Sequence, residues 1–166
     1  MNTYENLTLD QERALYGIHN ASVLHCLFDG PADGESALKE TSRLHIEDCD
    51  FHLRYPMWHM ADSSIINCRM TETCRAALWY DQGLEIHRSD LGGIKALREC
   101  DDTVITDSTI HSTEFGWYCR GLTVQNSHLT SEYPFLNSRN MLFEHFTMTG
   151  KYSFQYCTDT VIRHSH

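Results

Sequence analysis

Three stretches decide the fold: GLEIHRSDL at residues 83–91, TVITDSTI at 103–110 and GLTVQNSHL at 121–129. In each stretch apolar residues alternate with polar ones, a Ser follows, and another apolar residue stands two places further on. Alternation with a period of two is typical of a β-strand that has one buried face. Because related stretches recur upstream and downstream, the sequence predicts a stack of similar β units.

The small residue in this pattern recurs at a nearly constant spacing. Its successive positions differ by 23, 19, 21, 19, 19, 19 and 19 residues. A second, apolar column, here called the centre column, precedes each small residue by 11 positions, or by 10 in one coil. The small column is Cys26, Cys49, Cys68, Ser89, Ser108, Ser127, Phe146 and Ser165, and the centre column is Leu38, Met57, Leu78, Leu97, Trp117, Phe135 and Phe154.

The two columns predict an all-β fold, a single-stranded right-handed parallel β-helix. We expect about seven to eight coils of about 19 residues in one domain spanning residues 1–166. Residues 1–16 are expected to form an N-terminal cap and a starting half-coil, and the last coil is expected to be incomplete. The connection that varies in length carries insertions at 29–34 and 71–74, as solenoids tolerate on one edge.

Longer motifs between the strands resemble a known family. They are CRAALWY at 74–80, GIKALREC at 93–100, EFGWYCR at 114–120, SEYPFL at 131–136 and GKYSFQY at 150–156. In these the chain resembles a bacterial family of unknown function, number 3737, over nearly its whole length. The resemblance implies a right-handed β-helix and brings no established activity or cofactor. Because members of that family carry further coils, we expect this chain to be a truncated or shortened one.

Composition and charge exclude several classes of protein. The formal net charge of -10 disfavours binding to nucleic acid or to anionic membranes. No stretch approaches the length of a membrane span, and the first residues lack a secretory signal, so we expect a cytoplasmic protein. The seven cysteines lack metal-ligand spacing and share columns with serine. We therefore interpret them as structural, and we predict no metal and no cofactor.

Aromatic and cationic residues flank the centre column. If that column points inward, simple alternation sends its neighbours outward, where they would line an elongated groove. Exposed aromatic rings beside hydrogen-bonding charged groups suit an oligosaccharide. The predicted ligand-binding residues are Trp58, Trp79, Tyr118, Arg75 and Arg98. The alternative is that these rings cover a neighbouring loop or an oligomer contact.

Two carboxylates form the candidate catalytic pair. Glu114 and Glu132 are expected in one column of adjacent coils, near 4.8 Å apart by strand spacing. That separation would suit the acid and nucleophile of a glycoside hydrolase. The alternative is a surface charge ladder, in which Lys151 of the next coil neutralises them.

A second class of function is a non-catalytic scaffold. An incomplete last coil leaves a strand edge unpaired, and such edges favour pairing with another chain. This alternative predicts a homo-oligomer that forms through the C-terminal coil.

Overall fold

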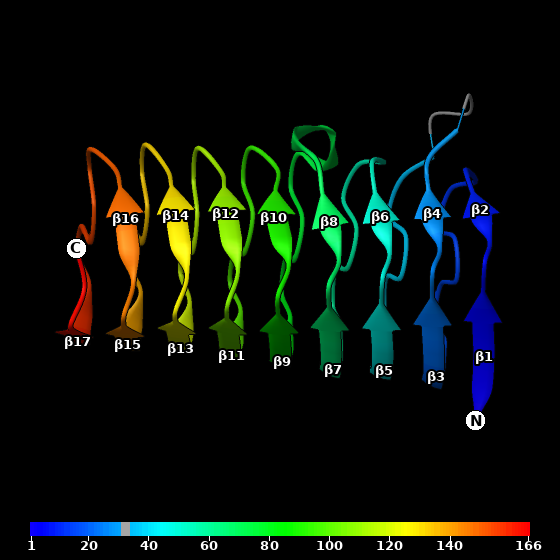
Figure 1. The fold of residues 1–166 in the computed structure, drawn as a ribbon, viewed down its shortest axis with the longest axis horizontal. Coiled ribbons are helices and arrows are strands. Elements are labelled where there is room, and N and C mark those ends of the chain that lie inside the picture. The colour runs from blue at the N-terminus through cyan, green and yellow to red at the C-terminus, as the bar shows by residue number, and fades with distance from the viewer. Residues whose placement is uncertain (31–33) are drawn as a thin grey trace.

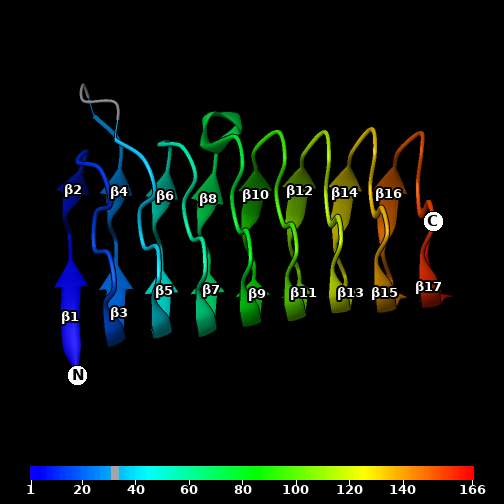
Figure 2. The ribbon, with the colours of Figure 1, turned by 180° about the vertical axis from the view of Figure 1, so that it is seen from behind.

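The protein is a parallel β-solenoid. The computed structural model describes residues 1–30 and 34–166. Each coil contributes one strand to a nine-stranded sheet and, before the last, one to an eight-stranded sheet, and a third segment then leads to the next coil. Figure 1 shows the coils side by side along a rod with the two termini at opposite ends, and Figure 2 shows the connecting segments from the other side. The predicted all-β solenoid with about 19 residues per coil is confirmed.

The strand bounds follow the repeat closely. The nine-stranded sheet contains β1 (Asn2–Glu5), β3 (His19–Leu24), β5 (Ser42–Glu47), β7 (Ala61–Ile66), β9 (Gln82–His87), β11 (Asp101–Thr106), β13 (Arg120–Gln125), β15 (Arg139–Glu144) and β17 (Thr158–Arg163). The eight-stranded sheet contains β2 (Thr8–Leu9), β4 (Leu27–Phe28), β6 (Asp50–Phe51), β8 (Arg69–Met70), β10 (Asp90–Gly92), β12 (Thr109–His111), β14 (His128–Thr130) and β16 (Thr147–Thr149). The segment expected to be a cap and half-coil already gives one strand to each sheet, through β1 and β2.

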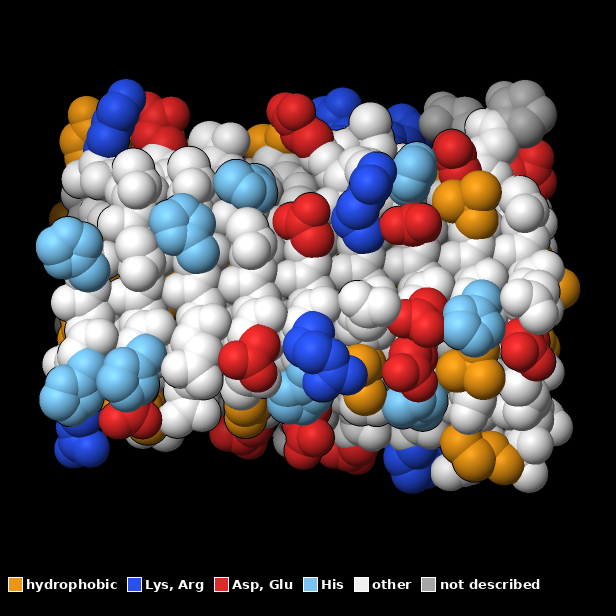
Figure 3. Space-filling model, in the orientation of Figure 1, with side chains coloured by type: hydrophobic (Ala, Val, Ile, Leu, Met, Phe, Trp, Pro, Cys, Tyr) orange, Lys and Arg blue, Asp and Glu red, His pale blue; other side chains and the backbone are white. Residues whose placement is uncertain are grey.

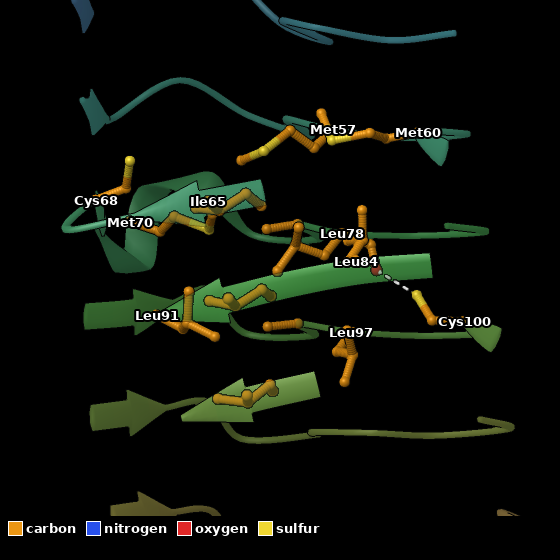
Figure 4. Close-up of a cluster of buried hydrophobic side chains, with 14 of the residues drawn as sticks. Met57, Met60, Ile65, Cys68, Met70, Leu78, Leu84, Leu91, Leu97 and Cys100 are labelled. Atoms are coloured by element: carbon orange, nitrogen blue, oxygen red, sulfur yellow. Dashed lines mark hydrogen bonds between the residues drawn. The ribbon is translucent and has the colours of Figure 1, made fainter. Parts of the chain in front are cut away.

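Side chains of equal register stack in the interior. One inward column of the nine-stranded sheet has seven members with no exposed surface, and they run from β3 to β15. They are Val23, Ile46, Ile65, Ile86, Ile105, Val124 and Phe143. Figure 4 shows the central part of this core, where the Cys100 thiol donates a hydrogen bond of 3.1 Å to the Leu78 carbonyl of the preceding coil. Because β-branched and aromatic side chains pack well on a pleated surface, this column favours the strands that it joins.

The small column is confirmed and has a clear physical role. The Ser108 hydroxyl accepts a hydrogen bond from the backbone N–H of Ser89 and donates one to the carbonyl of Thr106. Ser89 and Ser127 make the same pair of bonds in their own coils. In these coils the slot holds a small side chain that accepts a backbone N–H, and the Cys49 thiol does the same for the Cys26 N–H, whereas Phe146 is the exception in the column.

The corners of the coil adopt left-handed backbone conformations. The residue after each long strand has φ between 47° and 56°. Asn, Asp and His tolerate this region better than most residues, and they fill all but one of the positions. The column is Asn6, His25, Asp48, Asn67, Arg88, Asp107, Asn126, His145 and His164.

The centre column also bends the backbone, and here the predicted alternation is wrong. Leu78 has φ of 61°, and both Leu78 and the preceding Ala77 are fully buried. A left-handed residue breaks the period of two, so the position before the centre faces the core and cannot form the floor of a groove. The prediction that Trp117 belongs to the centre column is also wrong. The bridge from Arg98 to Trp117 puts Trp117 one position after the centre, and Gly116 takes the inward slot.

The insertion at 71–74 forms a 3₁₀ turn, η1 (Glu72–Cys74), which stands above the rod in Figure 1. The other predicted insertion, at 29–34, lies partly outside the described residues, because only its two flanks are described. Within residues 1–30 and 34–166, no helix has the length and apolar character needed to cross a membrane.

Candidate functional site

The surface that carries most of the predicted site is formed by the third segments of the coils. We call it the third face, and it comprises the outer side of residues 35–40, 54–59, 75–80, 94–99, 113–118 and 132–137. Its central column aligns Trp58, Trp79, Arg98 and Trp117 through isolated parallel bridges. Four successive coils therefore place large planar groups above one another.

These four side chains form one continuous stack. The Trp58 and Trp79 rings lie 4.9 Å apart between centroids, with an interplanar angle of 4°. The Arg98 guanidinium carbon lies 4.9 Å from the Trp79 centroid and 4.6 Å from the Trp117 centroid. Both distances suit a cation–π contact, so one cation is held between two indole rings.

Hydrogen bonds fix the stack to the backbone. The indole N–H groups of Trp58, Trp79 and Trp117 donate to the carbonyls of Ala76, Lys95 and Tyr133, at 2.7, 2.7 and 2.6 Å. Each acceptor lies in the coil that follows its donor.

The hydrogen-bond acceptor of Arg98 is a side chain, whereas the acceptors of the tryptophans are backbone carbonyls. The Arg98 Nη2 donates to the Glu114 carboxylate at 2.8 Å. The Glu114 N–H bonds to the Ile94 carbonyl. This register places Glu114 at the position whose backbone carbonyl accepts the indole N–H in the other coils.

The structure thus brings together Trp58, Trp79 and Arg98, as the sequence predicted, and adds Trp117. The facing surfaces of these groups cover one another, so a sugar ring has no access between them. The signal for Trp117 was in the sequence, because in its coil alone the small residue follows the expected centre by 10 positions and not by 11.

The two predicted catalytic carboxylates do not share a column. The register of the backbone hydrogen bonds aligns Glu114 with Lys95 and Tyr133, while Glu132 lies one position earlier in its coil. Glu114 contacts Arg98 at 2.8 Å and Lys95 at 3.8 Å, and Glu132 pairs with Lys151 at 3.4 Å. The Lys151 contact is the one that the surface-ladder alternative predicts. Catalysis by the two carboxylates stays a prediction.

Arg75 lies apart from the stack. It follows η1 with φ of 55°, and its exposed side chain lines a hollow of about 430 Å³ together with His52, Leu53 and Thr73. Tyr118 lies in a third place, 46% exposed, on the rim of a hollow of about 610 Å³. The predicted ligand-binding residues therefore divide among three sites.

A further hollow of about 500 Å³ lies beside η1, and the sequence analysis did not predict it. Its lining includes Gly92 and Gly93. A Cβ at Gly92 would stand 2.3 Å from the Met70 carbonyl oxygen, and Gly93 has φ of 119°. Only glycine fits this pair of positions, so the floor of the hollow is bare backbone.

The face shown in Figure 3 has a different character. Charged and histidine side chains are spread over it among backbone and other side chains, and hydrophobic side chains appear only as scattered spots. Several histidines of the chain pair with acids, as His25 does with Asp48 at 3.3 Å and His45 with Glu47 at 2.9 Å. This surface favours solvation over apolar docking.

One carboxyl is buried inside the rod. Asp81 is 2% exposed and stands in a column whose other members include Cys100, Cys119 and Ser138. Its Oδ1 accepts the Met60 N–H at 2.8 Å, whereas Oδ2 has no hydrogen-bond partner among the described residues. Burial raises the pKa of this carboxyl well above its usual range.

Comparisons with known proteins give a family match and no activity. A family model described as a protein of unknown function (DUF3737) matches residues 2–166. No curated protein matches the chain. Among solved structures, the plasmid-mediated fluoroquinolone resistance protein QnrB1 is similar at 17% identity, with a TM-score of 0.37, over 99% of this chain and 91% of that one.

Proposed function

The chain belongs to the DUF3737 family of proteins of unknown function, and from that premise we propose that it is a non-catalytic scaffold that associates end to end with a second copy. In this arrangement β17 of one copy pairs with β1 of the next, and the solenoid continues across the junction. The observation that carries the proposal is the exposure of Ile162.

Ile162 ends the inward column that is otherwise buried from Val23 to Phe143. It aligns with Phe143, which has no exposed surface, yet Ile162 itself is 51% exposed. Among the described strands β17 pairs only with β15, so the N–H and C=O groups on its other edge have no strand partner. Unpaired parallel edges with apolar side chains promote pairing with another chain.

The opposite end of the rod is complementary in register. Tyr4 of β1 begins the same inward column and is half-buried. The neighbouring outward column begins with Glu5 and ends with Arg163. Continuing the register across a junction would place Ile162 on Tyr4 and Arg163 beside Glu5, which buries apolar surface and joins opposite charges.

Sedimentation and light scattering over a range of concentrations test this proposal. We expect the mass of the 166-residue chain to rise with concentration, and Ile162→Asp to hold the chain as a monomer. Val161→Asp is the matched control, because Val161 lies on the same strand in an outward column and is 42% exposed. A chain that remains monomeric at high concentration would contradict the proposal.

A charge swap tests the direction of pairing. Arg163→Glu and Glu5→Lys should each weaken association, and the double variant should restore it because the pair is then reversed. Failure of the double variant to restore association would rule out the junction between β17 and β1.

Carbohydrate binding on the third face is a second candidate function. The observation that favours it is the exposure of aromatic rings: Tyr80 is 37% and Tyr118 46% exposed, and each contacts a tryptophan ring that lies against the Arg98 guanidinium. The mutual stacking of Trp58 and Trp79 weighs against these two rings as sugar platforms. A glycan array with the wild-type chain tests this candidate, and absence of any binding would remove it.

A further inference from the structure

We propose that the hollow beside Tyr118 binds a neutral oligosaccharide, with the Tyr118 ring as its stacking platform. This inference rests on the second candidate function and gives it a location. It moves the predicted ligand site away from the tryptophan stack, to the corner where the third face meets the nine-stranded sheet.

The hollow spans three successive coils in two neighbouring columns. One column holds Glu99, Tyr118 and Asn137, all exposed, and the other holds Asp101, Arg120 and Arg139 at the start of their strands. Successive coils lie about 4.8 Å apart, so the lining repeats over a distance of about 10 Å. The volume of about 610 Å³ lies in the range of small-molecule sites.

Unlike Trp58, Trp79, Tyr80 and Tyr133, Tyr118 has no ring stacked on it among the described residues. Trp58 and Trp79 cover each other, His59 stacks on Tyr80 at 4.9 Å, and Tyr133 stacks on Tyr152 at 5.1 Å.

The contact of Tyr118 with Trp117 is edge-on, at 6.4 Å and 80°. Its neighbours in the column are Glu99 and Asn137, which carry no ring. A flat apolar ring face therefore opens into a polar hollow, an arrangement that suits the C–H face of a sugar.

The polar groups around the ring can bind hydroxyl groups. Arg120 is paired with Asp101 at 2.5 Å, which holds that part of the wall in place. In the described parts of the chain, the side chains of Glu99, Asn137 and Arg139 make no hydrogen bond or ion pair with another residue. They supply a carboxylate acceptor, an amide and a guanidinium donor.

The charges of the lining balance. Glu99 and Asp101 carry two negative charges, and Arg120 and Arg139 carry two positive ones. Because the rest of the chain is strongly acidic, with a net charge of -10, an acidic saccharide would be repelled at long range. The balance of local and overall charge favours a neutral sugar.

The test is a titration of the full chain with neutral disaccharides, namely cellobiose, maltose, chitobiose and mannobiose. Saturation-transfer NMR detects binding, and tryptophan fluorescence gives affinity because Trp117 contacts Tyr118. We expect at least one of these sugars to bind. We expect Tyr118→Ala to weaken binding by about tenfold or more, which corresponds to about 1.4 kcal/mol. Tyr118→Phe should retain most of the binding, and Asn137→Ala should weaken it several-fold.

Tyr156→Ala is the matched control, since Tyr156 stands in the same column, is 82% exposed and lies outside the hollow. The inference is overturned if none of the four sugars binds, if Tyr118→Ala leaves affinity unchanged, or if Tyr156→Ala weakens binding equally. Stronger binding of digalacturonate would overturn the neutral class. Ile162→Asp should not affect sugar binding, so failure of end-to-end association and failure of this site are distinguishable.

Discussion

The guanidinium carbon of Arg98 lies 4.6 Å from the centre of the Trp117 ring, while its Nη2 donates a hydrogen bond to Glu114. A planar cation thus replaces one indole in a stack of four, and it hydrogen-bonds to a carboxylate of the next coil. Lysine could supply the charge but neither the planar face nor the forked donors.

We therefore predict that Arg98→Lys lowers the free energy of unfolding by about 1–2 kcal/mol, the usual range for a lost cation–π contact together with a charged hydrogen bond. Urea denaturation followed by tryptophan fluorescence measures this. Arg88→Lys is the control, because Arg88 is an exposed corner residue. Equal stability of the two variants would show that the stack contributes little.

The serine ladder should be sensitive to loss of a single hydroxyl. Ser108→Ala leaves the buried N–H of Ser89 without its acceptor at 3.1 Å, and we expect a cost of about 1–3 kcal/mol. Ser108→Cys should cost less, because cysteine fills the same column in three other coils. Thermal unfolding compares both variants with Thr109→Ala, whose side chain is exposed on the neighbouring strand. A smaller loss for Ala than for Cys would contradict the proposed role of the slot.

Asp81 should make stability depend on pH. Because burial raises the pKa of Asp81 in the folded state, the folded protein holds a proton that the unfolded chain releases above about pH 4. Stability therefore falls as pH rises from that value through the raised pKa. Asp81→Ser should flatten this decline and raise stability at pH 7, measured by urea unfolding between pH 4 and 8. Asp62→Ser, at an exposed position, should keep the wild-type dependence of stability on pH. The same dependence in Asp81→Ser would contradict the prediction.

The cysteines should differ in reactivity. Burial raises the pKa of Cys74 to about 12 and also raises that of Cys157, which is only half-buried in the last coil. Since the thiolate is the reactive form, we expect Cys157 to react first with a thiol reagent and Cys74 only on unfolding. Mass spectrometry of partly labelled protein identifies the site, and Cys157→Ser should remove the fast phase. Fast labelling of Cys74 would contradict the packing of the interior.

The repeat could be predicted from sequence because its cause is periodic. Stacking requires that the same slot recur in every coil, so the positions of Cys49, Cys68 and Ser89 are visible as a spacing. The third segments could not be predicted in the same way. Their centre residues adopt left-handed conformations, as Leu78 does, and a strand period of two does not hold across such a bend.

The candidate site could be predicted only in part, because its residues lie in these third segments. The columns of Trp58, Trp79 and Arg98 follow from register, whereas Trp117 and Glu114 each lie one position away from where alternation puts them. The sequence pattern does not indicate that the Trp58 and Trp79 rings stack on each other, nor that the Tyr118 ring has no stacked partner. This distinction arises only from the coil-to-coil contacts.

The ladder of Ser and Cys has a consequence for how such a chain can change length. Each Ser or Cys of the ladder hydrogen-bonds to a backbone group of its own coil and to one of a neighbouring coil. No coil therefore depends on a distant part of the rod. Gain or loss of a whole 19-residue unit would therefore leave the remaining units intact, whereas a deletion of a few residues would break the match between adjacent rungs. Variation in length among relatives should accordingly occur in whole turns.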